Sequence, residues 1–331
     1  MKLGILDQVV LPEGKTHAQV LTHTEEMIRQ AETLGYERYW FAEHHSTNGM
    51  MSAAPELWIA RWAAAAPSMM FGSGGILLPQ YSPLKVAEQF STLETMFPGR
   101  VELGVGRSPG GTERTREALA GGASAMDDFL RQVGELKGFL QDTLPKNHRH
   151  RIVKTTPRHA PAPPLWILGL SPGSAETAAA AGAGLVFGHF ISPDKWEETL
   201  RSYREQAGEK ARVRTCVFVV CAETEETAEA LLKTQDAWMQ QYRRGSTIIP
   251  SPETARRMLD DPETKRAAEN ERRRTVYGTP SQVLDQLEEL ARRYESDDFL
   301  LITNIHDLDA RLTSYRLLMA EKEKRAAVSV G

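Results

Sequence analysis

Short apolar runs alternate with longer segments of helical spacing along most of this chain. The runs have the length and apolar content of buried strands, and they fall at residues 2–6, 39–42, 69–79, 100–107, 165–170, 185–188, 213–221 and 299–303. The segments between them repeat apolar residues three and four positions apart, as helices packed on a sheet do. Eight strands, each paired with a helix, predict an α/β fold and favour a (β/α)8 TIM barrel. An open doubly wound sheet is the alternative.

Capping residues mark several of the expected helix starts. Ser82-Pro83 supplies an N-cap and a first-turn proline for a helix that reaches Met96. Ser192 does the same for a helix from Pro193. Residues 279–282, TPSQ, hold a Thr and a Gln at the spacing of a capping box. These signals predict where the helices begin more sharply than the apolar spacing does.

Two segments interrupt the alternation. Residues 108–164, after strand four, combine a Gly/Thr loop, a helix near 125–144 and a connector rich in Pro, His and Arg. Residues 243–277, after the helix that follows strand seven, are highly charged and contain prolines, so we interpret them as a surface excursion or an active-site lid. No linker composition separates these insertions from the rest. Residues 1–331 are therefore predicted to form a single domain.

Composition narrows the expected partners. The 331 residues carry 40 basic and 44 acidic side chains, a formal net charge of -4, which offers no basic footprint for nucleic acid. No apolar run reaches the roughly 18 to 20 residues that span a membrane, and the N-terminus has no signal-peptide core. Cys216 and Cys221 stand at an odd offset in one strand, which fits unpaired thiols in a reducing compartment. We expect a soluble cytoplasmic protein that acts on a small molecule.

The second strand ends in a group of ionisable residues. Glu43, His44 and His45 directly follow its apolar residues, and the carboxyl ends of strands are where α/β folds place chemistry. Alternation puts His44 on the face of Trp40, and Glu43 and His45 on the other face, so at most one histidine points into a barrel. Histidines that are merely solvated or bonded to backbone would give the same tripeptide.

The end of strand four carries a candidate anion ligand. Residues 104–111, GVGRSPGG, do not match a dinucleotide fingerprint, because the spacing is G-x-G-x-x-x-G and a proline and two glycines stand where a helix should start. What remains is Arg107 at a strand end. Its guanidinium suits a phosphate and equally suits a structural ion pair.

The end of strand five carries a second anion-directed feature. Gly169 is followed by Ser171 and other small and hydroxyl residues at a helix start, where free N–H groups and the helix dipole favour an anion. Ser174 and Thr177 lie one turn apart and can face the same phosphate, although simple N-capping by Ser171 explains part of the pattern. Because strands four and five are neighbours in a barrel, the two features together predict a phosphate-bearing cofactor.

Other chemistries find less support in the sequence. Glu43, His44, His45 and His189 lack the spacing of convergent metal ligands, so no metal site is predicted. No GxSxG motif is present to anchor a serine-hydrolase mechanism.

Taken in order, these motifs resemble the bacterial-luciferase-like flavin monooxygenase family. The matching segments are EHH ending strand two, ILLPQYSP closing the Gly-rich strand three, GVGR ending strand four, SPGSAET after strand five, and VYGTP at 276–280. The resemblance implies a TIM barrel that binds reduced FMN at its C-terminal face and activates O2 at flavin C4a. It also implies a separate flavin reductase that supplies the reduced cofactor.

The resemblance further implies roles for single residues. His44 matches the family's active-site histidine, whose imidazole donates a hydrogen bond or acts as acid or base. Gly74 and Gly75 match a segment that in relatives holds a non-proline cis peptide against the isoalloxazine ring. The cofactor-binding residues predicted from the strand ends and from the resemblance are Gly74, Gly75, Arg107, Gly169, Ser171, Ser174 and Thr177.

Two departures from the family pattern shape the functional prediction. Gly106 stands where luciferase has a cysteine, and Gly173 replaces an acidic residue, so we expect a non-luminescent member that uses reduced FMN and O2 to oxygenate a small, apolar organic substrate. An F420-dependent dehydrogenase of the same fold and a non-catalytic flavin-binding relative are the alternatives. Trp58 and Trp62 stand where family members dimerise and predict a homodimer, although packing inside a monomer explains them equally.

Overall fold

Eight parallel strands close into a barrel. The computed structural model describes residues 1–108, 110–120, 128–158 and 160–330. The strands follow the order β1 (Lys2–Asp7), β2 (Arg38–Phe41), β3 (Met70–Ser73), β5 (Val101–Gly106), β6 (Leu165–Gly169), β7 (Gly184–Gly188), β8 (Val213–Cys221) and β10 (Asp298–Ile302). Because β10 pairs with both β1 and β8, the ring has no open edge there. The predicted (β/α)8 barrel is confirmed, and the open sheet is excluded.

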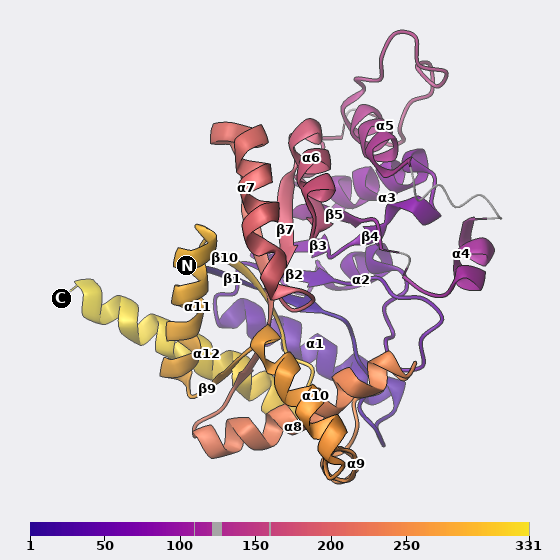
Figure 1. The fold of residues 1–331 in the computed structure, drawn as a ribbon. Coiled ribbons are helices and arrows are strands. Elements are labelled where there is room, and N and C mark those ends of the chain that lie inside the picture. Colours follow the sequence, from indigo (N-terminus) through magenta and orange to yellow (C-terminus); the bar gives the residue numbers. More distant parts are fainter. Residues whose placement is uncertain (109, 121–127, 159, 331) are drawn as a thin grey trace.

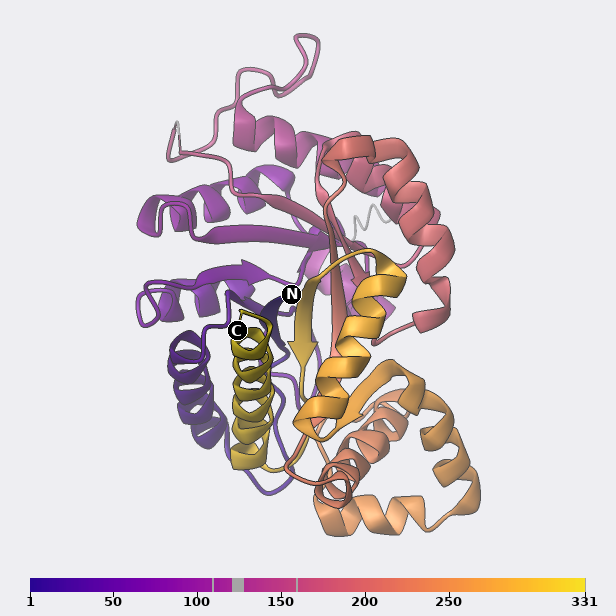
Figure 2. The ribbon, with the colours of Figure 1, turned by 90° about the vertical axis from the view of Figure 1, so that its left-hand side faces the viewer.

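Helices surround the barrel on its outer side (Figures 1 and 2). They are α1 (His17–Thr33), α2 (Pro55–Trp62), α3 (Pro83–Met96), α6 (Pro172–Ala181), α7 (Trp196–Ala207), α8 (Glu225–Arg243), α11 (Pro280–Tyr294) and α12 (Leu308–Val330). The capping box predicted at Thr279 is present, and Thr16 forms a second one with Gln19. In Figure 2 the yellow α12 stands beside the indigo α1, so the last helix packs next to the first.

Both insertions contain more regular structure than the sequence indicated. The first holds α4 (Glu113–Ala120), where a Gly/Thr loop was expected, and α5 (Phe129–Gln141), a shorter form of the helix predicted near 125–144. Residues 125–127 of that prediction lie outside the described residues. Because α4 is largely polar, the spacing of apolar residues did not predict a helix there.

The second insertion is also largely helical. It holds α9 (Pro252–Leu259) and α10 (Pro262–Glu271), which pack beside α8 (Figure 1). Its last residues are not part of an excursion, because they form a strand, β9 (Thr275–Gly278). This strand pairs with residues 218–221 of β8, beyond residues 213–216 that pair with β7. A further short strand, β4 (Ile76–Leu77), pairs with β5. The helix predicted from Pro193 begins with a 3-10 turn, Pro193–Lys195, before α7.

Side chains of the strands divide into an inner and an outer core. Leu6, Trp40, Trp166, Val186, Cys216 and Leu300 belong to one buried cluster, whereas the alternate positions of the same strands pack in another cluster with the helices. The two cysteines are buried and free, with Cys216 in the inner cluster and Cys221 in the outer one. This alternation confirms that Trp40 faces inward and that Tyr39 and Phe41 face outward.

The helix expected at a dimer contact packs largely within its own chain. Trp62 is 1% exposed, and the ring of Trp58 stacks on that of Phe41 with centroids 5.6 Å apart. Leu57 on the same helix is exposed. The dimer therefore stays a prediction. In the described part of the chain, no helix is both long enough and apolar enough to cross a membrane.

Four charged side chains meet inside the amino-terminal end of the barrel. Arg214 on β8 contacts both carboxylate oxygens of Glu102 on β5, at 3.1 and 3.2 Å, and Asp298 at 3.1 Å. Arg38 on β2 donates to Asp298 at 2.7 Å. The guanidinium of Arg214 also lies 3.9 Å from the ring centre of Trp166. Because each of these charged groups has a partner of opposite charge, the barrel tolerates their burial, and the network connects four strands.

This network predicts a large and specific loss of stability. Replacing Arg214 by Met keeps the side-chain volume but leaves Glu102 short of its main partner in an apolar interior, so we expect a loss of about 3 to 5 kcal/mol in the free energy of unfolding. Urea denaturation of both proteins measures it. The matched control is Arg293→Met, which removes an exposed pair with Glu289 and should cost no more than about 0.5 kcal/mol. Equal losses in the two variants would refute the role of the buried network.

Candidate functional site

The candidate site lies at the carboxyl ends of β2, β4, β5 and β6, which we call the barrel mouth. Neighbouring parallel strands place their ends at the same edge, so segments far apart in sequence meet there. The register pairs Trp40 with Gly72 and Gly104 with Trp166, which brings the strands that precede EHH, the Gly-rich segment, GVGR and SPGSAET into adjacent positions. All segments singled out from the sequence thus belong to one end of the barrel.

His44 lies two residues beyond Ala42, which belongs to the inner apolar cluster. Its backbone N–H donates to the carbonyl of Ser52 at 2.9 Å, which fixes the chain just beyond the strand. Its Nδ1 is buried and has no hydrogen-bond partner in the described part of the chain. Burial, and then the neighbouring His45, lower the pKa of His44 to about 4. The imidazole is therefore neutral at physiological pH and keeps a free ring nitrogen.

Glu43 and His45 are bonded to each other. Nε2 of His45 is 2.6 Å from Oε1 of Glu43, and the hydroxyl of Tyr81 donates to the same oxygen at 2.6 Å. Oε2 of Glu43 accepts the backbone N–H of Leu77 at 3.0 Å. Tyr81 lies within the ILLPQYSP segment, but its role could not be predicted from the sequence. No periodicity links a loop residue to a carboxylate nearly forty positions earlier.

The Gly-rich segment after β3 comes very close to its neighbours. The peptide bond between Gly74 and Gly75 is cis, as the resemblance implied. A Cβ added to Gly75 would stand 2.9 Å from the carbonyl oxygen of Gly104, and one added to Gly74 would stand 2.5 Å from Leu6. These positions therefore require glycine for backbone packing, and their contact with a cofactor stays a prediction.

The end of β5 presents an open surface next to a free cation. A Cβ added to Gly106 would meet nothing closer than 3.9 Å, so the space beside this residue is not filled by side chains. Arg107 is exposed, and across the described residues its guanidinium has neither an ion pair nor a hydrogen bond. The structural ion pair that was the alternative for Arg107 is thus absent from the described part of the chain.

The helix start after β6 shows how its hydroxyl groups are used. Ser171 is the N-cap of α6 and accepts the N–H of Ser174, and the two hydroxyl oxygens lie 3.2 Å apart. Thr177 is 5% exposed and donates its hydroxyl to the carbonyl of Gly173 at 2.8 Å. A Cβ on Gly169 would collide with Ser174. The hydroxyl of Thr177 is thus used within the helix, which contradicts its expected role as a free phosphate ligand, whereas contact of Ser171 and Ser174 with a phosphate stays a prediction.

Residues 247–251 of the predicted lid are tied to the loops after β1 and β2. Gly49 donates its N–H to Oγ1 of Thr247 at 2.7 Å, and Thr247 donates its own N–H to Asn48 at 2.8 Å. Trp238 donates to the carbonyl of Thr247 at 3.0 Å. Met50, Trp238, Met239 and Ile249 also join the inner apolar cluster. The apolar cluster inside the barrel thus takes in Trp238 and Met239 of α8 and Ile249 of the insertion, which the sequence did not single out, and the role of the insertion as a lid stays a prediction.

The other histidine at a strand end serves the packing of helices. Nδ1 of His189 lies 2.7 Å from the hydroxyl of Tyr294 on α11, and Nε2 lies 3.2 Å from the carbonyl of Arg273. Both ring nitrogens are thus engaged. Among the described residues, no group of three or more His, Cys, Asp or Glu side chains could hold a metal ion.

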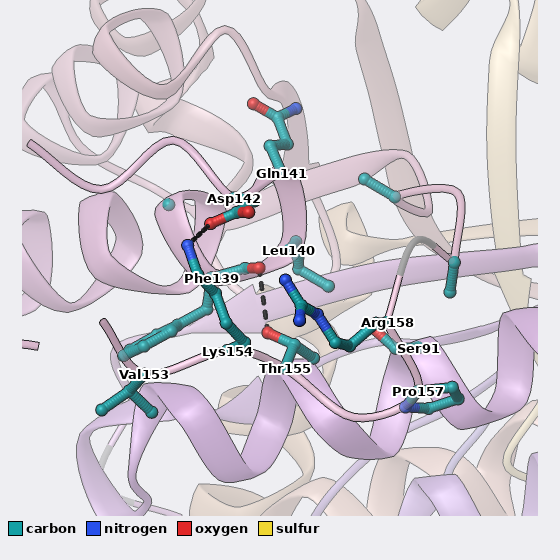
Figure 3. Close-up of a pocket in the computed structure, with 13 residues that line it drawn as sticks. Ser91, Phe139, Leu140, Gln141, Asp142, Val153, Lys154, Thr155, Pro157 and Arg158 are labelled. Carbon is teal, nitrogen blue, oxygen red and sulfur yellow. Dashed lines mark hydrogen bonds and ion pairs between the residues drawn. The ribbon is translucent and has the colours of Figure 1, made fainter. Parts of the chain in front are cut away.

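A hollow of about 260 Å³ lies elsewhere, outside the barrel (Figure 3). Its walls come from α3, α5 and the connector that follows α5. In Figure 3 Arg158 extends across it, Lys154 is paired with Asp142, and Thr155 donates to the carbonyl of Phe139 at 2.9 Å. None of the strand-end residues named above lines this hollow, so it is separate from the candidate site.

The buried His44 predicts how stability depends on pH. The folded protein binds a proton at His44 with a pKa of about 4, whereas an unfolded histidine does so near 6.5, so the unfolded chain binds more protons between these values and stability falls as the pH falls. We expect His44→Gln to remove about 1 to 2 kcal/mol of the loss between neutral pH and pH of about 5. Urea denaturation at both pH values measures this. The same substitution at exposed His17 should leave the slope unchanged; an equal effect there would contradict the assignment.

Comparison with known proteins agrees with this geometry. A family model described as luciferase-like monooxygenase matches residues 1–295. YceB of Bacillus subtilis is 43% identical over 323 residues, which cover 96% of this chain and 98% of the relative. The N-acetyl-S-alkylcysteine monooxygenase of the same bacterium is 32% identical over 326 residues, with 96% and 97% covered. The crystal structure of apo-MsnO8 has a TM-score of 0.89 at 36% identity and covers 97% of this chain and 98% of that one.

Two more distant solved structures share the fold alone. One is the oxygenating constituent of 3,6-diketocamphane monooxygenase from Pseudomonas putida in complex with FMN, with a TM-score of 0.71, 18% identity and 97% of each chain covered. The other is an F420-dependent secondary alcohol dehydrogenase, with a TM-score of 0.64, 15% identity, and 95% and 97% covered. The same barrel is thus found with either cofactor.

Proposed function

This chain belongs to the luciferase-like monooxygenase family of oxidoreductases, and from that premise we propose that it uses reduced FMN and O2 to oxygenate a small organic substrate. The observation that carries the proposal is the meeting, at one barrel mouth, of a neutral, partly buried histidine, a glycine with space beside it, and an arginine that has no partner among the described residues. The sulfur-containing substrate named for the Bacillus subtilis relative adds small thioethers to the apolar compounds worth assaying.

The residues at the mouth fit a flavin mononucleotide. Arg107 supplies a fixed positive charge, and Ser171 and Ser174 supply hydroxyls at the positive end of α6, so a phosphate would find three donors there. The space beside Gly106 leaves room for a flat ring against the backbone. Bound reduced FMN supplies the reaction with O2, and the protein's task is to bind, orient and shield it.

His44 is the residue we assign to proton transfer. Its imidazole is neutral and could accept a proton from, or donate a hydrogen bond to, a group placed at the mouth. Trp238, Met239 and Ile249 would keep water away from that group. We also propose a separate flavin reductase as the source of reduced cofactor and a homodimer in solution.

The second candidate is an F420-dependent dehydrogenase, because a solved enzyme of that class has the same barrel. Absorbance titrations of the apoprotein with FMN and with F420 separate the two. We expect FMN to bind and F420 to bind weakly, and we expect protein-bound reduced FMN to be reoxidised by O2 in a single turnover. Tight F420 binding without FMN binding would refute the proposal. FMN binding without substrate-stimulated turnover would favour the non-catalytic alternative.

The phosphate assignment is tested by removing one charge. Arg107→Ala should weaken FMN binding about 10- to 100-fold, because a charge-assisted hydrogen bond contributes about 1.5 to 3 kcal/mol. Riboflavin, which lacks the phosphate, should bind both proteins equally, and fluorescence titration measures all four affinities. The matched control is Arg114→Ala at a nearby exposed arginine. If riboflavin and FMN bind the wild type equally well, the phosphate site is assigned wrongly.

A further inference from the structure

Three side chains next to His44 form a closed triangle of hydrogen bonds that the proposed function does not yet use. Oε1 of Glu43 lies 2.6 Å from Nε2 of His45 and 2.6 Å from the hydroxyl of Tyr81, and those two atoms lie 3.1 Å apart. Glu43 is 4% exposed, and the side chain of His45 is 11% exposed. The triangle is therefore sheltered from solvent, so the position of each proton within it affects the strength of its hydrogen bonds.

The donors around Glu43 determine where the proton of His45 lies. The N–H of Leu77 can only donate, and the hydroxyl of Tyr81 donates its single proton to Oε1. An ionised Glu43 satisfies both. An unprotonated Nε2 would then point its lone pair at Oε1 across 2.6 Å, which is repulsive. Nε2 of His45 consequently carries a proton, and the short distance is that of a charge-assisted hydrogen bond.

The opposite nitrogen of His45 is therefore the one with a free lone pair. Within the described residues, both hydrogen bonds of the ring are made by Nε2 and none by Nδ1. A carboxylate that holds one ring nitrogen fixes the tautomer and stabilises the imidazolium formed when the other nitrogen accepts a proton. We propose that Glu43 and Tyr81 are positioning residues that hold His45 as a second proton acceptor, through Nδ1, beside His44. The tautomer stands by itself, whereas the role in turnover rests on the proposed function.

The two adjacent histidines differ in their surroundings. His44 has no carboxylate partner in the described part of the chain, and burial keeps its pKa low. His45 faces the carboxylate of Glu43 and the hydroxyl of Tyr81. Among the described residues, charged groups near the triangle include Glu56, whose pKa is raised by burial and by Glu43, and Lys85, which faces Glu56. A positive charge on His45 would lie beside the carboxylate of Glu43, whereas one on His44 would have no carboxylate beside it in the described part of the chain.

Glu43→Gln is the sharpest test, because the N–H of Leu77 decides how the new amide lies. The N–H of Leu77 needs an acceptor, so the oxygen of the new amide must face it. The NH2 group then takes the place of Oε1 and faces Nε2 of His45. His45 must then accept at Nε2 and carry its proton on Nδ1. Nitrogen-15 NMR of the histidine-labelled apoprotein at neutral pH, with His45→Asn to assign the signals, should report Nε2–H in the wild type and Nδ1–H in the variant.

Tyr81→Phe is the matched control. It removes one donor from Glu43 but leaves the carboxylate, so His45 should keep its proton on Nε2. The rate constant for reoxidation of protein-bound reduced FMN by O2 is then measured in a single turnover. We expect it to fall about 100-fold in Glu43→Gln, the magnitude of a lost acid–base group, and less in Tyr81→Phe, while FMN affinity stays within about threefold.

Two results would overturn the proposal. One is a wild-type His45 with its proton on Nδ1, which would mean that Glu43 is neutral and donates. The other is a Glu43→Gln protein whose tautomer switches while its reoxidation rate is unchanged. If the wild type binds no FMN, the proposed function fails instead, and the NMR measurement still decides how His45 is held.

Discussion

A barrel filled by its own side chains has little interior space, and in this protein charged side chains occupy part of that space. Glu102 and Arg214 lie opposite each other across the amino-terminal end, with Arg38 and Asp298 completing the network. Each ion is costly to bury alone and tolerated only with its partners in place. The register of four strands is thereby coupled, because a slip of one residue would send a charged side chain to the wrong face.

The same logic recurs at the other end of β2. Arg38 begins this strand inside the ionic network, and Glu43, two residues beyond its end, accepts hydrogen bonds from its own loop, from β4 and from the segment after β4. That carboxylate links the EHH stretch to the residues that follow the cis Gly74-Gly75 peptide. The parts of the site expected to meet a flavin and a proton are thus held in register by one buried acid.

Much of the fold could be predicted because local signals and global packing agree. Apolar runs marked all eight barrel strands, and the capping box at Thr279 marked the start of α11. The misses have physical reasons. The helix α4 is polar, and β9 is a short strand within a charged segment, so neither carries a strong pattern. Thr177 has the spacing of a phosphate ligand, but its hydroxyl satisfies the carbonyl of Gly173 instead.

The sequence by itself determined the fold class, the family and the strand ends at which chemistry gathers, because strand periodicity and short motifs are local properties. It also assigned His44 to the inward face, since alternation has a period of two. Only the tertiary structure decided that Tyr81 completes a triangle with Glu43 and His45, that Arg107 is left unpaired in the described residues, and that Trp238 and Ile249 join the apolar cluster inside the barrel. These are contacts between distant segments, and their partners are chosen by how the barrel closes.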